Sequence, residues 1–277
     1  MTTGTAVSPA LPAAGSSFYL GMRILPKARR EAMYAIYAFC RAVDDIADDG
    51  GPRPERAAAL AEWRRDIDIL YRDGTTTALT ADLAPHVPAY ALPRESFHDV
   101  IDGMAMDVEA DIQAPDWKVL DLYCDRVASA VGRLSARVFG LSPRDADELA
   151  HHLGRALQLT NILRDLDDDA AIDRLYLPSE ELRAAGMHDL TPAAVLAHPG
   201  LDTACRAVAQ RAFAFYDGAN VVMARQSRAS VKAPRMMEAA YRAVLELTLR
   251  RGWRAPRARV RTPKLKLLGA LLRYGFP

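Results

Sequence analysis

Apolar residues recur every three or four positions along most of the chain, which is the spacing of one face of an α-helix. In the stretch 93–112, for example, Phe97, Ile101, Met104 and Val108 fall on one face. Strand-like alternation, internal repeats and low-complexity blocks do not stand out in the sequence. We therefore predict an all-α protein. The pattern predicts helices over about 26–49, 53–73, 93–112, 116–139, 143–168, 179–185, 191–197, 200–226, 232–251 and 263–274.

Composition supports the same fold class. Half of the 277 residues are hydrophobic, and runs of β-branched residues are nearly absent, which favours helix. The first residues, 1–15, are rich in Thr, Ala, Pro and Gly, and we predict that they are disordered. No shift in composition divides the remainder, so we predict a single all-helical domain over 16–277.

Targeting and cysteine features indicate a cytoplasmic protein. The N-terminus lacks a basic region followed by an apolar run, and no uninterrupted apolar run reaches about 18 residues. Cys40, Cys124 and Cys205 lie in apolar helical patterns without CxxC spacing. We interpret them as reduced thiols of the core.

A polar stripe runs along the predicted helix 143–168, between large aliphatic residues. Spacings of three, four and four residues place Gln158, Asn161, Asp165 and Asp169 on one helix face. Buried carboxylates without a partner cost several kcal/mol even after relaxation. The stripe therefore requires a cation.

A second pair of carboxylates, Asp44 and Asp48, lies at the edge of the apolar arc of the predicted helix 26–49. Acidic residues four apart repel each other in a bare helix, so either pair alone could be a solvated helix end. Two such pairs instead favour a two-sided site between facing helices. Carboxylate oxygens suit Mg²⁺, which typically bridges a few carboxylates to substrate phosphates. We therefore predict a substrate that carries a diphosphate.

Arginines lie beside both acidic pairs. Arg41 neighbours the first pair, Arg164 neighbours Asp165, and Arg174 follows the second pair. Surface ion pairing is the alternative interpretation, but guanidinium groups match phosphate oxygens bidentately. We therefore predict that these arginines hold the diphosphate.

Signatures of other chemistries are absent. The glycines form no GxG, so neither a dinucleotide fingerprint nor a Walker loop is present, and neither HExxH nor GxSxG occurs. His151 and His152 are adjacent and therefore lie on different helix faces, as surface or packing residues.

The C-terminal region is basic. From Arg250 to Arg273 there are nine Lys or Arg residues and no acid. This tail lacks the interleaved aromatic residues of a nucleic-acid site, beyond Trp253 and Tyr274. Leucines beside the charges favour peripheral contact with the inner membrane surface, and a solvated final helix is the alternative.

Several segments resemble the squalene/phytoene synthase family. They are Ser17-Phe18-Tyr19, Tyr37 through Asp48, Tyr123 through Ala128, and Gln158 through Asp169. The resemblance implies the all-α isoprenoid synthase fold, a helical bundle around a central cavity, and the joining of two prenyl diphosphates head to head. Within the family, Pro26 through Tyr34 and Gly252 through Val260 look most like the bacterial presqualene diphosphate synthases of hopanoid biosynthesis.

The resemblance also implies roles for single residues. The implied catalytic residues are Arg41, Asp44, Asp48, Tyr123, Asp165 and Asp169. The implied ligands of two or three Mg²⁺ ions are Asp44, Asp48, Asn161, Asp165 and Asp169. The implied substrate contacts are Ser17, Phe18, Tyr37, Arg41, Gln158, Asn161, Arg164, Arg174 and Tyr176. Gly154, one turn before Gln158, would leave a gap through which a prenyl chain could pass.

The implied reaction converts two farnesyl diphosphates into presqualene diphosphate and diphosphate, and downstream squalene-forming enzymes become candidate partners. The base that takes the final proton stays open between the released diphosphate and a tyrosine. This chain is shorter than the eukaryotic squalene synthases, so we expect no NADPH-dependent step. The alternatives are a phytoene synthase that uses geranylgeranyl diphosphate, a squalene synthase that completes the reduction, and a non-catalytic helical assembly factor.

Overall fold

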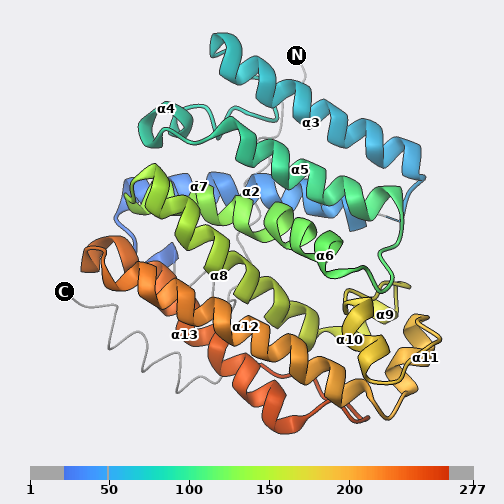
Figure 1. Ribbon diagram of the computed structural model, residues 1–277. Helices are drawn as coiled ribbons and strands as arrows, with labels where there is room; N and C mark the ends of the chain where they lie inside the picture. Colours follow the sequence, from blue (N-terminus) through green and yellow to red (C-terminus); the bar gives the residue numbers. More distant parts are fainter. Residues whose placement is uncertain (1–21, 49, 262–277) are drawn as a thin grey trace.

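The computed structural model describes residues 22–48 and 50–261, and the described part is helical with no strand beyond one isolated bridge between Gln113 and Leu175 (Figure 1). The predicted all-α class is confirmed. The predicted segment 1–15, the contacts Ser17 and Phe18, and the predicted helix 263–274 lie outside the described residues. The helices are α2 (Lys27–Asp48), α3 (Arg53–Asp73), α4 (His86–Tyr90), α5 (Arg94–Glu109), α6 (Trp117–Cys124), the π-helical turn η1 (Asp125–Ser129), α7 (Ala130–Phe139), α8 (Pro143–Arg164), α9 (Leu166–Ala170), α10 (Ser179–Ala184), α11 (Pro192–Ala197), α12 (Leu201–Ala224) and α13 (Arg228–Arg251).

Helix α8 is the central element of the bundle. It begins at Pro143, and the hydroxyl of Ser142 accepts a hydrogen bond from the backbone N–H of Asp145 at 3.2 Å, which caps the first turn. Figure 1 shows α8 between α7 and α12, and it also contacts α13 and η1. Small residues allow this close packing, because a Cβ at Gly132 of α7 would lie 3.0 Å from the Cβ of Ala150.

The predicted helix 143–168 is divided in the structure, so the polar stripe does not follow one continuous helix. Helix α8 ends at Arg164, Asp165 has φ −106° and ψ 17°, and α9 begins at Leu166. Carboxylates are unfavourable at a helix C-terminus, where the dipole is negative, and favourable in a first turn. The break therefore moves three aspartates from the end of one helix to the start of the next. They are Asp167, Asp168 and Asp169.

The predicted helix 116–139 is also interrupted. It consists of α6, the π turn η1 and α7, which follow one another without a loop. A π turn holds one more residue per turn than an α-helix, and such turns occur mostly where a side chain must be re-aimed. Apolar periodicity could not reveal it, because a single extra residue barely changes the pattern. Helix α4 lies between the predicted helices 53–73 and 93–112, where the sequence pattern predicted no helix.

After α13, a buried tryptophan attaches the chain to the end of α8. Trp253 is 1% exposed, and its indole N–H donates to the carbonyl of Leu163 at 2.8 Å. That carbonyl belongs to the last turn of α8, which has no helical donor left. Trp253 thereby fixes the C-terminal segment 252–261 against the end of α8.

Trp253→Phe keeps a ring in this position and leaves the Leu163 carbonyl buried without a donor. We expect a loss of about 1–3 kcal/mol in the free energy of unfolding, measured by urea denaturation. Trp117→Phe is the matched control, since its indole donates to the half-exposed Glu181 and water can replace the bond. Equal losses in both variants would contradict the capping role of Trp253.

Candidate active site

The two acidic pairs predicted from the sequence face the same region of the bundle. Asp44 and Asp48 lie in the last turns of α2, and Arg174, in the loop after α9, donates to Asp48 at 3.0 Å. Asp169 is on α9, four residues after Asp165. The ion pair between Arg174 and Asp48 joins segments that are 126 residues apart in the chain.

Burial and mutual repulsion raise the pKa of one carboxyl in each pair. Burial, followed by the charge of Asp48, raises the pKa of Asp44 to about 6. Burial, followed by the charge of Asp165, raises the pKa of Asp169 to about 7. Asp107 adds to both shifts, so it lies within electrostatic reach of both pairs.

Asp107 of α5 is a site residue that sequence reasoning missed. It is 4% exposed, and its two carboxyl oxygens accept hydrogen bonds from the hydroxyls of Tyr123 and Tyr176, each at 2.9 Å. Burial raises its pKa, against the opposing effects of Arg174 and the two hydroxyls. The available signal was an acid inside the apolar pattern of 93–112, three residues after Met104.

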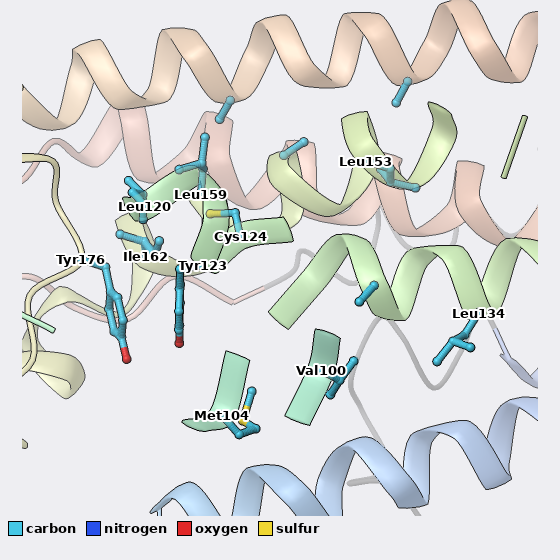
Figure 2. Close-up of a cluster of buried hydrophobic side chains, with 14 of the residues drawn as sticks. Val100, Met104, Leu120, Tyr123, Cys124, Leu134, Leu153, Leu159, Ile162 and Tyr176 are labelled. Atoms are coloured by element: carbon cyan, nitrogen blue, oxygen red, sulfur yellow. The ribbon is translucent and has the colours of Figure 1, made fainter. Parts of the chain in front are cut away.

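Tyr123 and Tyr176 form an aromatic wall beside this carboxyl. Their rings are stacked, with centroids 4.9 Å apart and planes 20° apart, and Figure 2 shows both hydroxyls pointing the same way. Burial holds the pKa of Tyr123 well above its usual value, so its hydroxyl keeps its proton and donates it to Asp107. The structure thus brings together two residues that the sequence placed in the site separately.

The end of α8 supplies an oxygen without a partner. The side-chain oxygen of Asn161 is buried and accepts no hydrogen bond, while its amide N–H donates to Gln158 at 3.5 Å. An unpartnered buried acceptor beside Asp165 and Asp169 suits a hard cation. Arg164 pairs with Asp165, its neighbour in sequence.

The donor set fits Mg²⁺ that is shared with a substrate. Within 22–48 and 50–261, no three acidic, histidine or cysteine side chains converge into a complete metal site. The carboxylates come instead as pairs on facing segments. Mg²⁺ commonly binds in this way, through one or two carboxylates, water and substrate phosphates. The ligands predicted from the sequence fit this mode of Mg²⁺ binding, in which a phosphate group would supply further oxygens.

Two apolar pockets lie next to the acidic pairs. The larger pocket, about 200 Å³, runs between η1, α7, α8 and α13, and Gln158 and Asn161 are polar residues of its lining. The smaller pocket, about 170 Å³, is lined by Asp44 and by apolar residues of α2 and α5. Val127 of η1 and Val131 of α7 line both pockets. Two apolar chains could therefore lie on either side of one wall, each beginning near one acidic pair.

The predicted substrate contacts on α2 belong to the smaller pocket. Tyr37 and Arg41 line it, together with Cys40. Arg41 is 56% exposed and pairs with Asp44 at 3.1 Å and with Asp45 at 2.6 Å. Arg174, by contrast, is 9% exposed, and its Nε atom has no partner.

The gap predicted at Gly154 is occupied. A Cβ at this position would lie 2.7 Å from the Cα, the backbone nitrogen and the hydroxyl of Ser129. Glycine is thus needed because η1 packs directly against α8. Gly154 nonetheless contributes to the lining of the larger pocket, and the passage of a prenyl chain beside it stays a prediction.

The first half of the basic C-terminal tail binds the protein itself. Arg257 pairs with Asp167 at 2.7 Å, and Arg259 pairs with Asp165 at 3.2 Å and with Asp168 at 3.1 Å. These two arginines therefore have intramolecular partners, and the membrane contact of the tail stays a prediction. The later part of the tail lies outside the described residues.

Comparison with known proteins agrees with these features. The family model described as squalene/phytoene synthase matches residues 11–266. The presqualene diphosphate synthase of Rhodopseudomonas palustris is 54% identical over 264 residues, which cover 95% of this chain and 94% of that protein. The protein of the same name from Sinorhizobium fredii is 53% identical over 264 residues, with the same coverage of each chain.

Solved structures give the same fold. The squalene synthase HpnC from Alicyclobacillus acidocaldarius superposes with a TM-score of 0.77 at 27% identity, covering 86% of this chain and 89% of that chain. A dehydrosqualene synthase in complex with ligand gives a TM-score of 0.78 at 25% identity, covering 93% of this chain and 90% of that chain. The helical bundle of the isoprenoid synthase fold, predicted from the resemblance, is confirmed.

The raised pKa values predict how proton and metal binding compete. Protonation of Asp44 and Asp169 favours the folded protein without metal, and this contribution is lost as pH rises through about 6 and about 7. Mg²⁺ needs the charged carboxylates. We therefore expect Mg²⁺ with inorganic pyrophosphate to raise the melting temperature more at pH 8 than at pH 6, measured by differential scanning fluorimetry.

A variant with both Asp44→Asn and Asp169→Asn is the control for this measurement. Its melting temperature should respond weakly to Mg²⁺ with pyrophosphate, and the difference between pH 8 and pH 6 should be smaller than in the wild-type protein, because these two side chains no longer have a proton to lose. If the wild-type protein gained the same stabilisation at pH 6 and pH 8, these carboxylates would not be the groups that take up the metal.

Proposed function

The chain belongs to the squalene/phytoene synthase family, and we propose that it joins two molecules of farnesyl diphosphate head to head. The products are presqualene diphosphate and free diphosphate. The observation that carries this proposal is the 54% identity, over nearly the full length of both chains, with a protein named presqualene diphosphate synthase. Two apolar pockets that share a wall, each beside an acidic pair, support it.

The acidic pairs and the arginines hold the two diphosphates. Asp44 and Asp48 on one side, and Asn161, Asp165 and Asp169 on the other, would supply oxygens to two or three Mg²⁺ ions. When bound, Mg²⁺ neutralises the diphosphate oxygens and makes diphosphate a better leaving group. The substrate-contact arginines are Arg41, Arg164 and Arg174.

The pockets keep water away from the cation that forms when one diphosphate leaves. This allylic cation would otherwise be quenched to an alcohol. The C2–C3 double bond of the second farnesyl diphosphate attacks it, and loss of a proton then closes a cyclopropane ring. The stacked rings of Tyr123 and Tyr176 lie on the side of the acidic pairs, where their π faces favour positive charge.

Asp107 can accept the final proton through Tyr123. The hydroxyl of Tyr123 already donates to Asp107, so its oxygen can accept the substrate proton while its own proton passes to the carboxylate. The hydroxyl of Tyr176 holds the second oxygen of Asp107 and keeps this carboxyl in place. The released diphosphate remains the alternative acceptor.

Incubation with farnesyl diphosphate and Mg²⁺, with and without NADPH, tests the function. We expect presqualene diphosphate under both conditions, identified by mass spectrometry. Squalene that forms only with NADPH would instead identify a complete squalene synthase, and the absence of any turnover would favour the non-catalytic alternative. Presqualene diphosphate must then be consumed by a squalene-forming enzyme.

Paired variants of neighbouring aspartates test the site in the same assay. Asp165→Asn removes a metal-binding charge, and we expect kcat to fall by about 100-fold or more. Asp167→Asn is the matched control, since Asp167 is 48% exposed and pairs with Arg257. It should keep activity within a few-fold of wild type. Similar losses in both variants would remove the assignment of Asp165.

The larger pocket also bears on the length of the prenyl chain. Its lining follows α8 from Leu149 to Asn161, a run of about 18 Å at 1.5 Å per residue, and Phe139 lies at the end away from Asn161. We propose that Phe139 closes the pocket beyond a C15 chain. A phytoene synthase would need room there for the longer geranylgeranyl chain.

Phe139→Ala should open this end of the pocket. We expect the ratio of kcat/KM for geranylgeranyl diphosphate to that for farnesyl diphosphate to rise about 10-fold or more, measured with each substrate separately. Phe215→Ala on α12, outside the pocket lining, controls for the general loss of a large side chain. An unchanged ratio in Phe139→Ala would place the length limit elsewhere.

A peripheral position at the inner membrane is part of the proposal. None of the helices in the described ranges has the length and apolarity needed to cross a bilayer. Lys264, Lys266 and Arg273, with the leucines between them, are the tail residues left for contact with an anionic membrane surface. Such contact would place the enzyme beside the phase into which its long prenyl product partitions.

A further inference from the structure

The π turn η1, Asp125–Ser129, is the irregular element in the wall between the two pockets. Val127, at its centre, lines both pockets, and Ala128 lines the larger one. A π turn is rare and less stable than a continuous α-helix, so surrounding contacts must hold it in place. These contacts are the close approach of two glycines and a network of buried arginine hydrogen bonds.

Two glycines make room for the widened turn. A Cβ on Gly103 of α5 would lie 2.7 Å from Cγ1 of Val127, and a Cβ on Gly154 of α8 would lie 2.7 Å from the Cα of Ser129. The turn is thus in close contact with α5 at Val127 and with α8 at Ser129. A shift of the turn by a few tenths of an ångström requires α5 or α8 to move.

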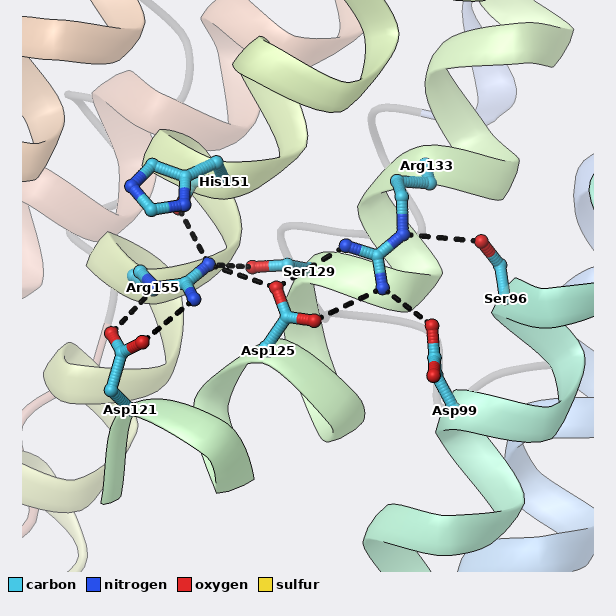
Figure 3. Close-up of polar contacts among 8 residues, drawn as sticks. All are labelled: Ser96, Asp99, Asp121, Asp125, Ser129, Arg133, His151 and Arg155. Carbon is cyan, nitrogen blue, oxygen red and sulfur yellow. Dashed lines mark hydrogen bonds and ion pairs between the residues drawn. The ribbon is translucent and has the colours of Figure 1, made fainter. Parts of the chain in front are cut away.

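A buried arginine ties the two ends of the turn together (Figure 3). Arg155 of α8 is 5% exposed, and its Nη1 atom donates to Asp125 and to the hydroxyl of Ser129, each at 3.0 Å. Asp125 is the first residue of the turn and Ser129 is the last. Asp121 fixes the same guanidinium through two bonds, at 2.7 and 2.9 Å.

A second arginine extends this network to α5. Arg133 of α7 donates to Asp125 at 3.2 Å, to Asp99 at 2.8 Å and to Ser96 at 3.2 Å. Asp125 is therefore bridged by arginines from α7 and α8, as Figure 3 shows. The residues of this network line neither pocket.

We propose that η1 is a specificity-determining partition between the two prenyl chains, and that Arg155 is the positioning residue that fixes it. This inference rests on the proposed function. Val127 sets how far the allylic cation lies from the C2–C3 double bond of the second chain. If the partition moves, the first diphosphate still leaves, but the cation reaches water before it reaches the second chain.

Gly103→Ala and Arg155→Lys test the partition from its two sides. We measure diphosphate release, presqualene diphosphate and C15 alcohols from farnesyl diphosphate and Mg²⁺. We expect presqualene diphosphate formation to fall by up to about 100-fold with little change in KM, because small misplacements of reacting atoms have effects of this size. Diphosphate release should fall much less, with the difference recovered as alcohols.

Gly218→Ala is the matched control. A Cβ on Gly218 of α12 would lie 2.5 Å from the ring of His152, so this variant also overpacks a contact with α8, away from η1. It should lower the melting temperature and leave the yield of presqualene diphosphate per diphosphate released unchanged. The same unchanged yield in folded Gly103→Ala and Arg155→Lys would reduce η1 to a structural role and overturn the inference.

Val127→Ala decides the question if the other variants do not fold. It trims the partition and leaves the arginine network intact, and it should lower the same yield; an unchanged yield would overturn the inference. A wild-type protein that makes no presqualene diphosphate would refute the proposed function instead. The two failures are therefore distinguishable.

Discussion

Repulsion among five aspartates is the constraint around which this bundle is arranged. Asp44, Asp48, Asp107, Asp165 and Asp169 influence one another electrostatically at one end of the helices. The protein without substrate balances them with hydrogen bonds from two tyrosines and with arginines that approach from distant parts of the chain. Mg²⁺ ions bound together with diphosphate would place more positive charge next to these carboxylates than the arginines do. Under the proposed function, metal and diphosphate binding would relieve this repulsion.

Helix periodicity predicted most of the fold, because the apolar spacing of a helix can be recognised within a short stretch of sequence. The prediction 53–73 coincides with α3. The prediction 26–49 is one residue longer than α2 at each end, and 179–185 is one residue longer than α10 at its C-terminal end. The breaks were missed for a physical reason. Asp165 interrupts the helix because of charge placement, and η1 exists because Gly103 and Gly154 leave space for it. Apolar periodicity does not register the charges that cause the first break, and the glycines that accommodate the π turn lie outside the interrupted segment 116–139.

Site residues that form pairs at helical spacing were predictable from the sequence. Residues whose partners lie far away in the sequence were not. The acidic pairs stood out by spacing. Asp107 did not, because a single acid in an apolar helix acquires meaning only when Tyr123 and Tyr176 point their hydroxyls at it. Arg259 was hidden for the same reason, since composition showed a basic tail and could not show that it folds back onto Asp165.

The return of Arg259 to the second acidic pair has a consequence for how substrate would enter. Arg259 pairs with Asp165, one of the carboxylates proposed to bind metal, so metal binding there would exchange one counter-ion for another rather than fill a bare acidic site. The displaced guanidinium would then lie beside the incoming diphosphate with its own charge uncompensated. The C-terminal segment would thus supply positive charge to the carboxylates at rest and to the anion during turnover, with little change in the total charge of the site.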